Sequence, residues 1–110
     1  MNEQQTTLLL PIKRQWYDMI KSGVKKEEYR EIKDYWKVRL AHGWLFNRNN
    51  IVCKDFDTVT LRNGYGKNDP TLVVECLGIT VGKGNPDWGA PEEQVFIIKL
   101  GNILKESNND

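Results

Sequence analysis

Residues 22–30 read Ser22-Gly23-Val24-Lys25-Lys26-Glu27-Glu28-Tyr29-Arg30 and join a short amphipathic helix to a strand that carries charged side chains. Glycine adopts the positive φ that commonly follows the last turn of a helix, so Gly23 is predicted to end the helix. Because alternate residues of a strand share a face, we expect Glu28 and Arg30 side by side, roughly 6.5–7 Å apart. Lys25 is out of phase with this pair in a regular strand. It joins the pair only from the turn before the strand, or at a bulge.

Two interpretations of these charges follow from the residues alone. A carboxylate and a guanidinium at this spacing form an oriented polar pair, which can hold each other or a ligand. The alternative is a solvated edge strand with incidental ion pairs, each contributing about 0–1 kcal/mol to stability.

The spacing Gly23-x-Lys25-x-x-Glu28-x-Arg30 resembles, position for position, the signature of the ASCH domain (activating-signal-cointegrator homology) of the PUA-like superfamily. The resemblance extends in order over roughly residues 7–104. It implies an α+β fold: a small mixed β-barrel of five or six strands, with two helices inserted after the first and second strands. In this family a cleft lies between the barrel and the helices, and the signature residues line it.

Hydrophobic periodicity places the other elements in an order that fits this architecture. In the first helix, Trp16, Met19 and Ile20 form the expected core stripe, with Tyr17 at its margin. Gly78 is expected to mark a bulge or a bend in a long strand. The expected helices span residues 14–22 and 32–43, and the expected strands, besides the signature strand, span residues 7–12, 56–62, 71–81 and 95–100, with a polar tail after residue 104.

The length of 110 residues predicts a single domain, residues 1–110, with a core over about 7–104 and polar termini. No apolar run reaches the roughly 18–20 residues of a membrane span, and the N-terminus lacks the order of a signal peptide. We therefore expect a cytoplasmic protein with no membrane partner. Cys53 and Cys76 lack metal-ligand spacing and are predicted to be free thiols, with Cys76 buried. His42 is the only histidine, so no cluster of histidines exists to hold a metal, and no cofactor is expected.

The net charge of +1 conceals an asymmetry. Residues 1–54 hold eleven Lys and Arg against six Asp and Glu, whereas residues 55–110 hold five against nine. A basic half fits an electropositive groove for a phosphate-bearing ligand, and it also fits chance. The near-neutral charge argues against coating of long duplexes.

By resemblance, Lys25, Glu28 and Arg30 are expected to line the cleft. Lys25 would supply a compact charge for phosphate, Arg30 a planar fork, and Glu28 an acceptor for amino groups. Tyr29 is either a core residue or a stacking surface, and Trp88, in the loop 82–93, is a solvent-facing stacking candidate. Glu75, within the long strand, completes the candidate set. The leading hypothesis is binding of RNA, a nucleotide or a modified nucleoside.

Two other classes of function stay open. Some small ASCH proteins are amidohydrolases on N4-acetylcytidine that use the signature lysine, a threonine three residues later and a glutamate from a later helix. Lys25 matches the lysine, but Glu28 stands at the threonine position; the candidate glutamates are Glu75, Glu92 and Glu93. A ribonuclease would use Lys25 and Glu28 as its candidate catalytic residues. The third class is a structural or partner-binding module with an inert cleft.

Overall fold

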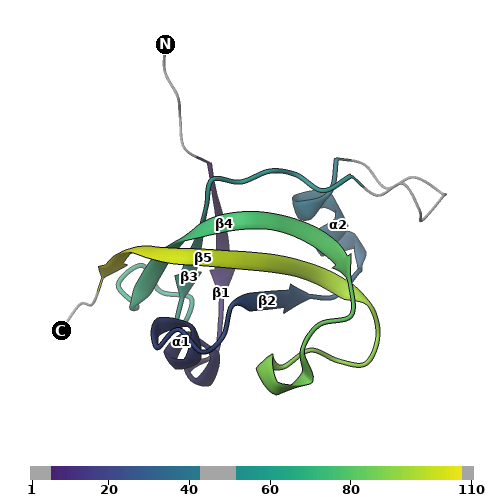
Figure 1. Cartoon of the computed structure of the whole chain (residues 1–110). Coiled ribbons are helices and arrows are strands. Elements are labelled where there is room, and N and C mark those ends of the chain that lie inside the picture. Colours follow the sequence, from purple (N-terminus) through teal and green to yellow (C-terminus); the bar gives the residue numbers. More distant parts are fainter. Residues whose placement is uncertain (1–5, 43–51, 108–110) are drawn as a thin grey trace, which may run out of the picture. The chain divides into compact units, whose positions relative to one another are not determined.

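The computed structural model describes residues 6–42 and 52–107. These residues form an α+β fold with two helices and five strands (Figure 1). As predicted, the helices follow the first and second strands. In chain order the elements are β1 (Thr7–Pro11), α1 (Arg14–Lys21), β2 (Glu27–Arg30), α2 (Asp34–Leu40), β3 (Thr58–Arg62), β4 (Thr71–Gly82), the 3-10 turn η2 (Pro86–Trp88) and β5 (Val95–Ser107).

The five strands form one mixed sheet in the order β1-β3-β4-β5-β2. β1 pairs with β3 in parallel, which requires a long crossover, and the chain makes it through α1, β2 and α2. β3 pairs with β4 and β2 pairs with β5, both antiparallel. β1 is an edge strand, in agreement with the position of Pro11 at its end.

The chain forms two compact units. The first consists of Met1–Lys26, Phe56–Leu77 and Leu100–Asp110, and the second of Glu27–Asp55 and Gly78–Lys99. In the first unit, the paired positions Leu8 with Val59 and Leu10 with Leu61 are buried across β1 and β3. In the second unit, β2 and the first residues of β5 supply the buried residues Tyr29, Val95, Phe96, Ile97 and Ile98.

The buried face of α1 differs from the predicted one. Tyr17 and Ile20 are buried, whereas Trp16 and Met19 are half-buried. The prediction that Tyr17 lies at the margin is therefore wrong. Four apolar side chains within five positions cover a wide arc of a helix, so periodicity alone does not fix the centre of that arc.

α2 is shorter than predicted, because it spans Asp34–Leu40 and not residues 32–43. Ile32 precedes the helix, and the predicted stop at Gly43 lies outside the described residues. Ala41 is already extended and forms a bridge with Cys53, which draws the backbone out of the helix. On this helix Leu40 is buried, but Tyr35 and Val38 are 52% and 69% exposed.

The last two strands, β4 and β5, also differ from the predicted ones. β5 continues to Ser107, so residues 105–107 belong to a strand and not to a polar tail. Cys76, predicted to be buried, is half-buried, and both cysteines are free. Gly78 has a φ of +132°, a value that L side chains rarely adopt, which agrees with the predicted bend or bulge in β4.

Candidate functional site

The turn after α1 positions Lys25. Gly23 has a φ of +88°, as predicted for a residue just past a helix. The backbone N–H groups of Val24 and Lys25 both donate to the Met19 carbonyl, at 3.0 and 3.1 Å. This turn leaves Lys25 only 1% exposed, with its Nζ 4.2 Å from the centroid of the Trp16 ring. A buried ammonium over an indole face is a cation–π contact in a desolvated setting.

Glu28 and Arg30 lie side by side on β2, as strand alternation predicts. Arg30 Nη1 is 3.5 Å from Glu28 Oε1, and the two side chains are 16% and 6% exposed. Neighbouring backbone groups hold both of them. Arg30 Nη1 donates to the Tyr29 carbonyl at 2.7 Å, and the Tyr29 N–H donates to Glu28 Oε1 at 3.2 Å. Such charge-assisted hydrogen bonds fix the orientation of both groups.

The partner strand shows what surrounds this pair. In the register of β2 and β5, Glu28 lies opposite Ile98 and Arg30 lies opposite Phe96. Directly opposed residues of an antiparallel pair share a face, and Phe96 and Ile98 are completely buried. The ion pair therefore lies among core residues and is not the solvated surface pair that the charges alone allowed.

Trp36 of α2 adds an aromatic face to this group. The Arg30 guanidinium carbon is 5.3 Å from the Trp36 ring centroid. Arg30 thus has a carboxylate and an indole among its neighbours, both within the second unit. A guanidinium held in this way presents a planar set of donors in a fixed direction.

Tyr29 is a core residue of the second unit. It is buried with Val95 and Ile97, and the half-buried Trp88 and Ala90 pack against these three residues. Its hydroxyl donates to Glu27 Oε1 at 2.7 Å and accepts from the Asn85 N–H at 3.0 Å. Burial is the main cause that raises the pKa of the Tyr29 phenol above its usual value. The neighbouring Glu27 raises it further, and the Asn85 N–H acts in the opposite direction.

This network predicts a specific loss of stability in alkali. The unfolded chain releases the Tyr29 proton near pH 10, whereas the folded chain retains it, so stability falls as pH rises above 10. The free energy of unfolding can fall by up to about 1.4 kcal/mol for each pH unit above 10. Urea denaturation at several pH values should show a flatter decline above pH 10 for Tyr29→Phe than for the native chain. Equal slopes would show that the phenol keeps an ordinary pKa.

Trp88 and Glu75 are both half-buried. Trp88, predicted to face solvent, ends the η2 turn and packs against the Tyr29 cluster with part of its surface. In the first unit, Glu75 Oε1 accepts the Asn102 N–H at 2.9 Å. A ligand role for either residue remains a prediction from sequence.

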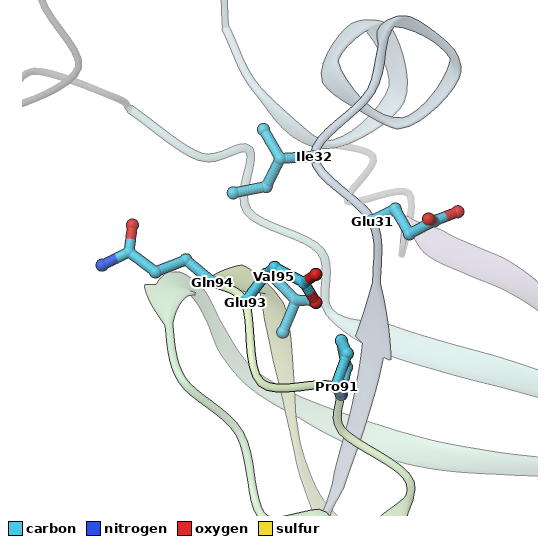
Figure 2. A pocket seen from close by; sticks show the side chains of 6 residues that line it. All are labelled: Glu31, Ile32, Pro91, Glu93, Gln94 and Val95. Atoms are coloured by element: carbon cyan, nitrogen blue, oxygen red, sulfur yellow. The ribbon is translucent and has the colours of Figure 1, made fainter.

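A pocket of about 300 Å³ lies in the second unit. Figure 2 shows the side chains of Glu31 and Gln94 projecting to opposite sides of it. Its two ionisable lining residues are both glutamates, so it is unsuited to phosphate. Glu31, Ile32, Pro91, Glu93, Gln94 and Val95 line this pocket.

No group of three or more His, Cys, Asp or Glu side chains suited to a metal ion occurs within residues 6–42 and 52–107. Among the helices of the described chain, none has the length and apolar character needed to cross a membrane.

Comparison with known proteins assigns neither a family nor a function to this chain. No protein-family model, curated protein or solved structure matches this chain. The ASCH resemblance therefore remains a prediction that rests on the four motif residues and on the order of the elements.

The predicted site did not include Trp36, Tyr35 or Arg39. Tyr35 and Arg39 carried a detectable signal, because residues four apart on a helix are neighbours and these two form a cation–π contact. The contacts of Trp16 with Lys25 and of Trp36 with Arg30 depend on how the chain folds back, which no local pattern encodes.

Proposed function

We propose that this protein binds RNA, a nucleotide or a modified nucleoside through Lys25, Glu28 and Arg30. The observation that supports this proposal is the Glu28–Arg30 ion pair on the face shared with Phe96 and Ile98. Withdrawing two charges from water costs several kcal/mol per ion before their attraction is counted, and an apolar pair would fill the same space. Binding of a ligand that contacts both charged groups would explain why an ion pair, and not an apolar pair, occupies these two positions.

The residue types fit a nucleotide. The Arg30 guanidinium offers paired donors to a phosphate or to a guanine edge, and the Glu28 carboxylate accepts from exocyclic amino groups. Trp36 supplies an aromatic face beside Arg30.

The proposal extends to family and location. We infer that the mixed sheet belongs to a PUA-like β-barrel, that the chain is an ASCH domain and that it acts in the cytoplasm. The order of strands and helices and the Gly23-x-Lys25-x-x-Glu28-x-Arg30 spacing support the family part of this inference.

Isothermal titration with nucleoside monophosphates and with short single-stranded RNA tests the binding proposal. Arg30→Ala should weaken binding about tenfold or more, because a charge-assisted contact is lost. Glu28→Gln should alter the preference among bases and retain phosphate binding. Arg14→Ala is the matched control, since it removes an exposed guanidinium that pairs with Asp18.

Two results would contradict the proposal. The first is no binding by the native chain to any nucleotide at millimolar concentration. The second is unchanged binding in Arg30→Ala with a native circular dichroism spectrum. Either would favour a structural role for the ion pair.

A further inference from the structure

Two aromatic rings of α2 lie in a row of contacts that begins at Arg30 and ends at a second arginine of the helix. Trp36 and Tyr35 meet edge to face, with ring centroids 4.8 Å apart and planes at 76°. The Arg39 guanidinium carbon lies 3.5 Å from the Tyr35 ring centroid. We call Trp36, Tyr35 and Arg39 the α2 ladder. All three belong to the second unit, as does Arg30 at its inner end.

The outer part of the ladder is exposed. Tyr35 is 52% exposed and its neighbour on the helix, Val38, is 69% exposed. Large apolar side chains in contact with water indicate a surface used for binding when they gather on one short helix. Arg39 Nη1 also donates to the Tyr35 carbonyl at 2.9 Å, which fixes the guanidinium over the ring.

The charge of this surface is positive where the ladder ends. Lys33 and Lys37 pair with Glu31 and Asp34, at 3.2 and 3.9 Å. In the described part of the chain, no carboxylate pairs with Arg39 or with Lys54. Lys54 Nζ donates to the Val38 carbonyl at 3.0 Å, so a second cation lies at the end of α2. Aromatic faces beside cations that have no carboxylate partner among the described residues complement a nucleic-acid strand.

We propose that the α2 ladder binds single-stranded RNA, with bases stacking on Arg39 and Tyr35 and phosphates meeting Arg39 and Lys54. A separation of 3.5 Å between the guanidinium carbon and the ring centroid is the contact distance of two stacked planes. Arg39 is exposed, and a base can stack on a guanidinium as on an aromatic ring. A duplex hides its base faces, so the ladder selects unpaired nucleotides.

The role of the α2 ladder rests on the proposed function, in which one nucleotide binds at Arg30. The neighbouring nucleotides of the same strand then bind along α2. This arrangement therefore predicts dependence on ligand length. A single nucleotide uses the motif residues alone, whereas a longer strand continues from Arg30 along Trp36, Tyr35 and Arg39.

Fluorescence anisotropy with a labelled single-stranded RNA of about six nucleotides tests the ladder. The oligonucleotide should bind the native chain about tenfold or more tightly than a mononucleotide does. Tyr35→Ala and Arg39→Ala should each weaken oligonucleotide binding by about five- to thirtyfold and leave mononucleotide binding unchanged. Arg39→Ala should also reduce the slope of log affinity against log salt concentration by about one, because about one phosphate contact is lost.

Matched controls separate stacking from charge. Tyr65→Ala and Lys67→Ala remove an exposed ring and an exposed cation from the turn between β3 and β4, and should change binding by less than about twofold. Arg39→Lys keeps the charge but loses the planar guanidinium, and should behave closer to Arg39→Ala. Full binding by Arg39→Lys would overturn stacking at this position. Equal binding of an RNA duplex would overturn selection of unpaired bases.

The outcomes distinguish the two proposals. Mononucleotide binding without a gain for the oligonucleotide overturns the ladder and leaves the proposed function standing. Oligonucleotide binding that depends on Tyr35 but not on Arg30 supports the ladder and overturns the proposed role of the motif. Oligonucleotide affinity that is unchanged in Tyr35→Ala overturns the ladder.

Discussion

Phe96→Ala is expected to lose about 3–5 kcal/mol of folding free energy. Phe96 is completely buried and lies opposite Arg30 in the register of β5 and β2. Removal of the ring loses the free energy gained by burying it. It also leaves a cavity, so the surrounding atoms lose their contacts with the ring. Domains of this size are stable by only about 5–15 kcal/mol, so this is a large share of the total. The melting temperature should fall by roughly 10–20 °C.

Two other variants on β5 serve as controls for this prediction. Phe96→Leu retains most of the apolar volume and should lose only about 1 kcal/mol. Leu104→Ala truncates an exposed side chain on β5 and should change stability by less than about 0.5 kcal/mol. A loss below about 1 kcal/mol in Phe96→Ala would mean that the ring does not pack as a core residue. Loss of nucleotide binding should accompany the destabilisation, because Phe96 supports the face on which Arg30 lies.

Gly84→Ala is expected to destabilise the fold by about 2–3 kcal/mol. A Cβ at this position would lie 2.7 Å from Tyr29 Cζ and 2.7 Å from the Ala90 Cβ, closer than such atoms approach. The loop must shift, which strains the hydrogen bond from the Asn85 N–H to the Tyr29 hydroxyl. Chemical denaturation of the variant measures the cost.

Gly82→Ala is the matched control for this prediction. Its Cβ would meet Ile97 Cδ1 at 3.6 Å, an ordinary contact, so the change should cost less than about 1 kcal/mol. Adding Ala90→Gly to Gly84→Ala removes the overlap with the Ala90 Cβ and should recover part of the loss. Equal stability of Gly82→Ala and Gly84→Ala would show that the loop does not pack on Tyr29.

The sequence determined the features that depend on local periodicity and backbone preference. Alternation along residues 27–30 was enough to place Glu28 beside Arg30. Gly23 adopts the positive φ that its place after a helix predicts. The alternating strands and the helical stripes likewise give the α+β class and the order of the elements, because each pattern repeats within a few residues.

Only the tertiary structure decided which faces are buried and what each side chain meets. Trp88 packs on the Tyr29 cluster, Lys25 lies over Trp16, and Arg30 lies beside Trp36. These contacts follow from pairing between distant segments, such as β2 with β5, whose register sets every cross-strand neighbour. Local patterns show that a side chain is apolar or charged, but its partner is fixed only when remote strands and helices come together.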